Sequence, residues 1–353
     1  MEFNFTEDQI LLRETVRDFL TGECSLDHVR ALWESESARS PEFWQKFSEI
    51  GVPGLLIPEA FGGLGMTEID FVGVMVEVGR AALAEPVVST AFVAAPLIRD
   101  CEDKALAALW LPKIATGEAI VAVAQPTSPL VGDVHIADLV IARSGDSLYA
   151  IPASEVTATA QRSNDPSQKL STIEFTPSSE WKIASGEAAD RLEAMALDRG
   201  ALACAAQQLG ACDQLITMSV EYTSQRKQFG VPIGSFQAVK HQVANLKVAL
   251  EYARSHVERA AHSVAIDAPT RSVDVSMAKI SAGEAALKAA ETSLQVHGAI
   301  GYTWEQDLHV WMRRAWTLDL AWGETAWHRA RLSSALFEDT LPTENFGYVP
   351  SLA

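Results

Sequence analysis

A short stretch in the second half of the chain carries the side chains with the clearest capacity for ligand binding. It reads Arg226-Lys227-Gln228-Phe229-Gly230-Val231-Pro232. An arginine can hold a phosphate through two parallel hydrogen bonds, a glutamine can bond a purine or ribose edge, and a phenylalanine offers a stacking face. The same residues also suit a plain turn between two helices, with the arginine lying along the surface. The stretch therefore indicates either nucleotide-type binding or an ordinary helix connection.

Regular apolar spacing predicts the helices that would carry this stretch. Beyond residue 187, apolar side chains recur alternately three and four positions apart, as in Phe236, Val239, Val243, Leu246, Leu250, Ala253 and Val257. This spacing predicts amphipathic helices that pack as a four-helix bundle, over 187–225, 236–267, 272–298 and 306–337. Gly230 and Pro232 would end the first helix. The Arg-Gln-Phe stretch is therefore expected at the corner between the first two helices.

The preceding half of the chain has a helical part and a β-rich part. Thr6 and Gln9 form a capping box that predicts a helix from about residue 6. Residues 51–65 are too rich in Gly and Pro for a helix, and they lack the strand and the Lys-Ser/Thr of a phosphate loop, which favours a structural turn. Short β-type runs follow at 120–124, 139–142, 148–151 and 170–175.

The expected fold class is α+β. The predicted domains are an N-terminal helical domain over 1–117, a small, shortened middle β domain over 118–186 and a C-terminal four-helix bundle over 187–353.

Composition excludes several classes of function. With 28 Lys+Arg against 46 Asp+Glu the net charge is −18, so nucleic acid is not an expected partner. The sequence has no apolar run of about 18 residues and no basic segment leading into an apolar one, so we expect a cytoplasmic protein without a membrane span. The Glu-x-x-His pairs of a di-iron bundle and the Gly-x-Ser-x-Gly of a serine hydrolase are both missing. Four scattered cysteines predict neither a zinc site nor a disulfide, so no metal is expected.

Several further motifs occur in a fixed order along the chain. Arg-x-Gln-Phe-Gly at 226–230 is followed by Phe236-Gln237, by Gln295-Val296-His297-Gly298 and by Arg313-Arg314-Ala315. Upstream stand Phe5-Thr6-Glu7-Asp8-Gln9, Pro58-Glu59-Ala60-Phe61-Gly62-Gly63-Leu64-Gly65 and Leu111-Pro112-Lys113. This set resembles the acyl-CoA dehydrogenase family over nearly the whole chain.

The resemblance implies an α–β–α architecture, FAD as cofactor and oxidation of an acyl-CoA thioester to the 2-enoyl-CoA. In that chemistry a carboxylate removes the α-proton while the β-hydrogen leaves as hydride to the flavin. An electron-transfer flavoprotein is the acceptor that the family uses. Arg226, Gln228 and Phe229 would reach the pyrophosphate and adenosine half of an FAD bound mainly to the neighbouring subunit. Gln295 and Gly298 would do likewise, although Ala299 replaces a second glycine of the family.

Other positions depart from the family pattern. The strand that contacts the flavin ring is reduced to Ala124-Gln125-Pro126-Thr127-Ser128-Pro129, and the region from Val131 to Ile141 is shortened. Counting from the Gln-x-x-Gly motif, with Arg313 and Ala315 fixing the register, the family's catalytic glutamate falls on Trp322. An indole cannot abstract a proton, so the usual base is missing.

Two other acids could supply the base. Some family members carry it in a Leu-Glu-Arg segment on the helix before the corner, which here reads Leu197-Asp198-Arg199. Asp198 is the preferred candidate, and Arg199 could keep it ionised or orient the thioester, although the two could also form a structural ion pair. Glu324 is a second candidate, pointing away from Trp322 if both lie in one helix.

The resemblance leaves two hypotheses open. In one, the chain is a catalytic subunit of an acyl-CoA dehydrogenase, acting on an acyl-CoA substrate. In the other it is a non-catalytic subunit that contributes FAD-binding and interface residues to a complete dehydrogenase chain. Contacts given across an interface are kept while those to the chain's own flavin ring are lost, which favours a hybrid of the two hypotheses. The expected partner is a second acyl-CoA dehydrogenase-like subunit in a heterotetramer, or a further copy of this chain. By analogy with paired subunits of sterol breakdown, the expected acyl group is bulky and sterol-derived.

Overall fold

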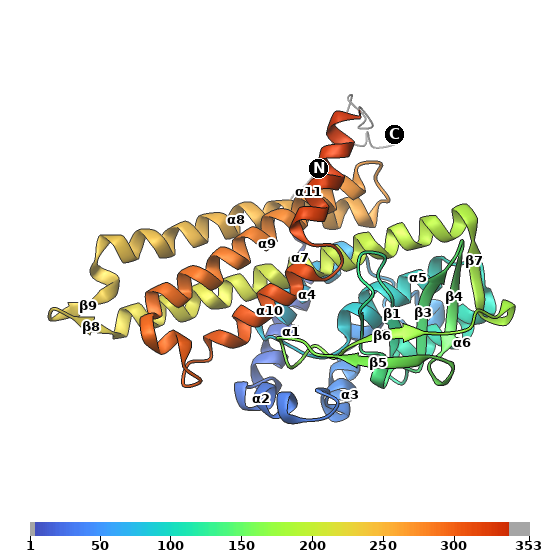
Figure 1. Cartoon of the computed structure of the whole chain (residues 1–353), viewed down its shortest axis with the longest axis horizontal. Coiled ribbons are helices and arrows are strands. Elements are labelled where there is room, and N and C mark those ends of the chain that lie inside the picture. Colours follow the sequence, from blue (N-terminus) through green and yellow to red (C-terminus); the bar gives the residue numbers. More distant parts are fainter. Residues whose placement is uncertain (1–3, 339–353) are drawn as a thin grey trace. The chain divides into compact units, whose positions relative to one another are not determined.

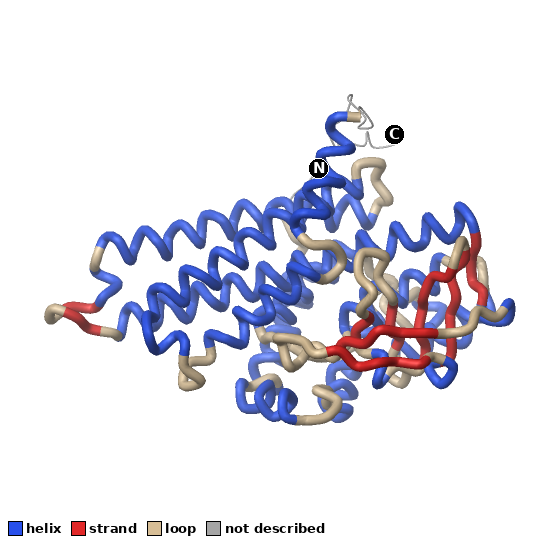
Figure 2. The backbone as a smooth tube through the Cα atoms, in the orientation of Figure 1, coloured by secondary structure: helices blue, strands red, loops and turns tan. Residues whose placement is uncertain are grey.

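The computed structural model describes residues 4–338 (Figures 1 and 2). These residues form two compact units. Of the described residues, unit 1 comprises 4–26, 72–83 and 204–338, and unit 2 comprises Asp27–Phe71 and Ala84–Ala203. The division into three domains at 117 and 186 stays a prediction. Residues 339–353 of the predicted C-terminal domain lie outside the described part.

Unit 1 is helical. It begins with α1 (Glu7–Glu23), whose capping box is confirmed: Thr6 Oγ1 accepts from the Gln9 amide at 3.2 Å, and Gln9 Oε1 accepts from the Thr6 amide at 2.9 Å. The unit also holds most of α4 (Glu68–Arg80) and of α7 (Gly186–Gln225), followed by α8 (Gln237–Ala265) and α9 (Arg271–His297). The helices predicted over 187–225, 236–267 and 272–298 are confirmed within two residues at each end.

The prediction of a single last helix over 306–337 is wrong. The chain forms two helices there, α10 (Leu308–Leu320) and α11 (Thr325–Phe337). Between them Trp322 and Gly323 have φ values of 58° and 94°. A right-handed helix cannot pass through left-handed residues, so the apolar period continues across a break in the backbone.

Unit 2 combines short helices with two small sheets. Its helices are α2 (Leu26–Glu34), α3 (Pro41–Glu49), α5 (Ala95–Asp100), α6 (Lys104–Ala115) and the beginning of α7. One sheet has the order β1-β3-β4-β7, formed by Val121–Val123, Leu139–Ser144, Ser147–Pro152 and Lys182–Ser185. The other has the order β2-β6-β5, formed by Val131–Gly132, Leu170–Glu174 and Thr157–Gln161. The four predicted β runs correspond to β1, β3, β4 and β6.

A buried π-helix, η3 (Val87–Ala94), supports the first sheet of unit 2. Thr90 Oγ1 donates to the carbonyl oxygen of Val121 at 3.1 Å and accepts from its amide at 3.1 Å. The Gly- and Pro-rich segment 51–65 forms two short 3₁₀ helices, η1 (Val52–Gly54) and η2 (Glu59–Phe61), joined by turns. A Cβ on Gly63 would come within 2.1 Å of the Ile57 carbonyl oxygen, so this segment is a close-packed structural turn.

Candidate functional site

The Arg-Gln-Phe stretch forms a hairpin between α7 and α8 of unit 1. Strands β8 (Lys227–Gln228) and β9 (Val231–Pro232) pair through a two-residue turn, and η7 (Ile233–Ser235) leads into α8. Phe229 and Gly230 occupy that turn with φ values of 52° and 83°. Positive φ at both central positions matches the twist of a tight hairpin. Figure 1 shows the hairpin at the left-hand end of the helices of unit 1.

The side chains of this hairpin are open to solvent. Arg226 and Gln228 are exposed, and 92% of Phe229 is exposed. Phe229 meets the edge of Phe236 at a centroid distance of 6.2 Å. Among the described residues the Arg226 guanidinium has no ion pair or hydrogen-bond partner, whereas Gln228 Nε2 donates to the Lys227 carbonyl oxygen at 2.9 Å. The hairpin thus exposes both a cation, Arg226, and an aromatic ring, Phe229.

The Gln-x-x-Gly motif lies at the same end of the bundle. Helices α8 and α9 are joined by a short connection, so the C-terminal end of α9 returns beside the start of α8. His297, at that end, stacks on Tyr222 of α7 with ring centroids 4.4 Å apart and planes 19° apart. Gln295 and Gly298 are exposed there, and Gly298 has φ 67° and ψ −144°, a conformation open to glycine. The structure therefore gathers Gln295 and Gly298 at the same end as the hairpin.

An apolar groove of about 830 Å³ lies next to the hairpin, between α7 and α8. Its lining is mostly aliphatic, with Lys240 and Lys247 also present. The aliphatic residues are Ile216, Val220, Pro232, Val239, Val243, Ala244 and Val248. Val220 and Val248 are about half exposed, at 47% and 55%. The sequence pattern does not reveal this groove, because Val239 and Val243 belong to the apolar stripe of the bundle and the other lining residues come from α7 and the hairpin or lie off that stripe.

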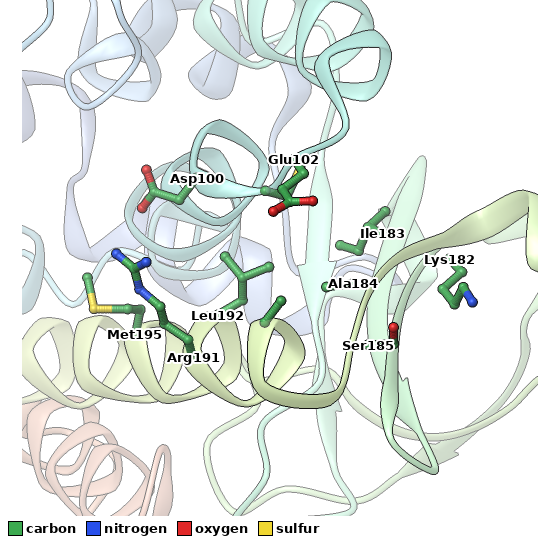
Figure 3. Close-up of a pocket in the computed structure, with 11 residues that line it drawn as sticks. Asp100, Glu102, Lys182, Ile183, Ala184, Ser185, Arg191, Leu192 and Met195 are labelled. Carbon is green, nitrogen blue, oxygen red and sulfur yellow. The ribbon is translucent and has the colours of Figure 1, made fainter.

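Unit 2 holds a second, more polar cavity of about 450 Å³ (Figure 3). It is lined by β7, by the first turns of α7 and by the residues that follow α5. Lys182 and Arg191 bring positive charge to the lining, and Asp100 and Glu102 bring negative charge. In Figure 3 the Arg191 side chain extends from α7 toward Asp100. The cavity can thus receive a ligand that has both polar and apolar parts.

Asp198 and Arg199 follow this cavity along α7. At 100° per residue, Arg199 falls on the helix face that Leu192 and Met195 present to the cavity, and Asp198 falls at its edge near Arg191. The Asp198 side chain is fully buried. Their roles as base and orienting residue stay predictions.

Arg199 has two acidic partners inside unit 2. Its Nε donates to Glu68 Oε1 at 2.7 Å, and a terminal nitrogen donates to Asp100 Oδ2 at 3.2 Å. Burial alone would raise the pKa of Asp100, but the hydrogen bond from Arg99 and the charge of Arg199 lower it below its usual value. These partners lie 131 and 99 positions away from Arg199, so no local sequence signal could have found them.

The turn between α10 and α11 carries the position expected for the usual base. Trp322 is buried there, with 7% of its surface exposed, and its carbonyl oxygen accepts from His328 Nε2 at 3.0 Å. Glu324 is exposed and precedes α11 as its N-cap residue. The expectation that Trp322 and Glu324 share one helix is wrong, because the backbone between them is left-handed.

The segment 124–129, where the resemblance places flavin-ring contacts, forms a turn between β1 and β2. Its polar groups bond one another: Thr127 Oγ1 donates to Gln125 Oε1 at 3.3 Å, and Ser128 Oγ accepts from the Leu130 amide at 3.1 Å.

Family profiles match most of the chain. The profile of the acyl-CoA dehydrogenase N-terminal domain matches residues 6–118, and that of the C-terminal domain matches residues 191–337. The chain belongs to the acyl-CoA dehydrogenase family. Among curated relatives, acyl-CoA dehydrogenase IpdE2 of Mycobacterium tuberculosis is 33% identical over 311 residues, which cover 88% of this chain and 91% of IpdE2.

Solved acyl-CoA dehydrogenase structures share the fold. A chain of the ChsE4-ChsE5 complex from Mycobacterium tuberculosis has a TM-score of 0.86 at 25% identity, covering 96% of this chain and 99% of that one. A chain of the Tcur3481-Tcur3483 steroid acyl-CoA dehydrogenase has a TM-score of 0.85 at 23% identity, covering 95% and 99%. Within the described residues 4–338, the helices are too short or too polar to cross a membrane.

Proposed function

We propose that the chain is a subunit of an FAD-dependent acyl-CoA dehydrogenase that converts an acyl-CoA thioester to its 2-enoyl-CoA. In this proposal it works in a hetero-oligomer, and its hairpin binds the ADP half of an FAD held mainly by the partner. The observation that carries the proposal is the hairpin itself, which exposes both Arg226 and Phe229 to solvent, with 92% of Phe229 exposed. Exposed aromatic rings of this size are typical of surfaces that meet a ligand or a partner.

The residues at this end fit the diphosphate and adenosine part of FAD. Arg226 can bond phosphate oxygens, Gln228 and Gln295 offer amides, and Phe229 offers a ring face. Gly298 lets a backbone approach the ligand closely. The segment 124–129 fits the flavin ring less well, because Thr127 bonds Gln125 and Ser128 bonds the Leu130 amide within the same turn. This contrast supports an FAD shared with a partner chain.

The apolar groove supports a partner subunit at this surface. It adjoins the hairpin, and its aliphatic residues would lose contact with water under a second chain. The relative in the ChsE4-ChsE5 complex also acts as one chain of a pair. An electron-transfer flavoprotein remains the proposed electron acceptor.

The polar cavity of unit 2 is the proposed entry for the acyl-CoA. Lys182 and Arg191 would bind its phosphates, and Leu192 and Met195 would pack against apolar parts of the chain. A bulky, sterol-derived acyl group is proposed on the likeness to the steroid dehydrogenase pair. Replacing Arg191 with Ala would raise KM for acyl-CoA with kcat little changed.

FAD, when bound, would accept the β-hydrogen of the substrate as hydride. Within this chain, an Asp198 carboxylate oxygen is the proposed acceptor of the α-proton, and Arg199 is proposed to keep Asp198 ionised or to orient the thioester. Trp322 stands at the sequence position of the usual base, and its indole cannot take a proton. The removal of the α-proton therefore depends on Asp198 or on a base of the partner.

The alternative is a non-catalytic subunit that only completes the FAD site of its partner. It is favoured by Trp322 at the base position and by the pairing of Arg199 with Glu68 and Asp100. The flavin-to-chain ratio of the chain purified alone and with a co-expressed partner dehydrogenase tests the shared-site proposal. We expect flavin only with the partner, at about one FAD per pair. A yellow, active protein from the chain alone would overturn it.

Arg226→Ala tests the hairpin within the same complex. The variant should lower the flavin content, because the phosphates lose a cation. Arg162→Ala, also exposed but located in unit 2, is the matched control. Unchanged FAD occupancy in Arg226→Ala would contradict the role of the hairpin.

A further inference from the structure

A cluster of buried polar side chains lies beneath the turn that joins α10 to α11, inside unit 1. Lys279 of α9 is fully buried, and its Nζ donates to the carbonyl oxygens of Leu318 and Asp319 at 2.8 Å each. These carbonyls belong to the last turn of α10, where backbone carbonyls lack N–H partners within the helix. Lys279 thus caps α10 at the place where the helix stops.

The other side of the turn is fixed from α11. Thr325 Oγ1 donates to Asp319 Oδ1 at 2.6 Å, which ties the first residue of α11 to the last turn of α10. His328 Nε2 lies 3.0 Å from the Trp322 carbonyl oxygen, and since a carbonyl only accepts, Nε2 carries the proton. Burial lowers the pKa of His328 to about 3, so the ring is neutral, and its Nδ1 lies 3.1 Å from the Ser276 hydroxyl oxygen.

The turn itself has a costly conformation. Trp322 has φ 58°, and a bulky side chain rarely adopts this region because Cβ crowds the backbone. Gly323, with φ 94°, suits its position, and a Cβ there would lie 2.8 Å from His328 Nε2. Strained conformations persist only where the surroundings hold them. The surroundings here are the hydrogen bonds from Lys279, Thr325 and His328.

We propose that Lys279 is a positioning residue that, together with Thr325 and His328, holds residue 322 in the left-handed conformation. The link to catalysis rests on the proposed function, in which residue 322 occupies the place of the usual base. The bonds that hold the turn do not depend on FAD or on a partner. The hydrogen bonds from Lys279, Thr325 and His328 keep the backbone shape of the turn although residue 322 is a tryptophan. They thereby fix the position of its indole in the proposed site.

Lys279→Met and Arg314→Met make a matched pair for testing this role. Arg314 of α10 is also fully buried and also donates to two backbone carbonyls, those of Leu83 at 2.6 Å and Ala82 at 3.1 Å. Both substitutions remove a buried cation, but only the first touches the α10–α11 turn. Amide hydrogen exchange of the full-length chain should be at least about tenfold faster over 318–328 in Lys279→Met than in the parent. Arg314→Met should leave exchange over 318–328 unchanged relative to the rest of unit 1.

Trp322→Gly separates local positioning from general stabilisation. Glycine adopts left-handed φ without a Cβ penalty, so the turn would need less support. In the Trp322→Gly background, adding Lys279→Met should change exchange over 318–328 by less than about threefold, a non-additivity that reports direct coupling. An equal Lys279→Met effect in both backgrounds would overturn the proposal, as would faster exchange over 318–328 in Arg314→Met.

Thr325→Val provides a milder test if Lys279→Met does not fold. It removes only the hydroxyl that bonds Asp319 and keeps the shape of the side chain. Faster exchange confined to 318–328, again suppressed by Trp322→Gly, supports the proposal, and unchanged exchange contradicts it. The exchange measurements need neither flavin nor substrate. They can therefore contradict the role of Lys279 while the flavin-to-chain ratio supports the shared FAD site, or support that role while the ratio contradicts the shared site.

Discussion

The imidazole of His297 lies flat against the ring of Tyr222, with centroids 4.4 Å apart. His297 adjoins Gly298, and Tyr222 lies one helical turn before Arg226, whose amide donates to the Tyr222 carbonyl oxygen at 2.9 Å. Burial lowers the pKa of His297, so the ring stacks in its neutral form at physiological pH. This stack joins the ends of α7 and α9, from which the proposed ADP-binding residues project.

Tyr222→Ala should therefore lower FAD content in the co-expressed complex without altering any proposed ligand of FAD. Loss of the ring removes a stacking partner of His297, an interaction of about 1 kcal/mol beyond burial, and loosens the end of α7 against α9. Flavin absorbance per complex measures the effect. Tyr222→Phe keeps the ring and should retain FAD, so a loss as large as that of Tyr222→Ala would argue against stacking as the cause.

Asp198→Asn should lower kcat of the complex by about 10² to 10⁴ if Asp198 takes the α-proton, since this is the range for losing a general base. Steady-state turnover with acyl-CoA is the measurement, and flavin content should stay constant. Glu187→Gln, at an exposed position on the first turn of α7, is the control. Unchanged turnover in Asp198→Asn would remove Asp198 as the base and leave the proton to the partner.

Glu77→Gln should destabilise the chain by about 3 kcal/mol at neutral pH, because three arginines would lose a buried partner. Glu77 contacts Arg13 at 2.7 Å, Arg17 at 2.8 Å and Arg80 at 3.1 Å. Burial alone would raise the pKa of Glu77, but the hydrogen bonds from Arg17 and Arg13 outweigh it and lower the pKa. Urea unfolding measures the difference, with the exposed Glu14→Gln as control.

The lowered pKa of Glu77 also makes its contribution to the stability of the chain depend on pH. Its stabilising contribution is present above the unfolded pKa of about 4.3 and is lost as pH falls through the lower folded pKa. The stability gap between the parent and Glu77→Gln should therefore shrink in acid. A gap that widens in acid would contradict this account.

Glu85→Gln should stabilise the folded chain at high pH, whereas Glu77→Gln should destabilise it. Burial raises the pKa of Glu85 to about 7, although the Ser40 amide donates to its Oε1 at 2.9 Å. The folded state then binds more protons than the unfolded state between about pH 4.5 and 7, so stability falls as pH rises through this window. The variant should be more stable than the parent at pH 8, by up to about 3 kcal/mol, and equal to it near pH 4. Urea midpoints at both pH values check this, and equal midpoints at pH 8 would refute it.

The helical part of the fold could be predicted where apolar spacing decides it. The bounds of α7, α8 and α9 follow from residues such as Leu246 and Leu250, which are fully buried as their spacing requires. The break between α10 and α11 could not be predicted in this way, because Trp322 has no preference for left-handed backbone and the apolar period runs through it. Strand β5 was missed because all five of its side chains are exposed and show no alternation.

The candidate site could be predicted only where its functional residues are close together in the sequence. The hairpin and the Gln-x-x-Gly motif are such cases, and the stack of Tyr222 on His297 brings them to one end. The partners of Arg199 come from other elements, and its pairing with Glu68 depends on tertiary packing alone. The two cavities likewise depend on how elements pack, which no local pattern encodes.

The groove between α7 and α8 also bears on how the protein must be made in a cell. Its aliphatic lining and the exposed Phe229 form an apolar surface that promotes nonspecific association when no partner covers it. In the proposed hetero-oligomer, chains synthesised in excess of the partner would be substrates for chaperones and proteases. Matched production of the two polypeptides, rather than the folding of this one alone, would then set the amount of working complex.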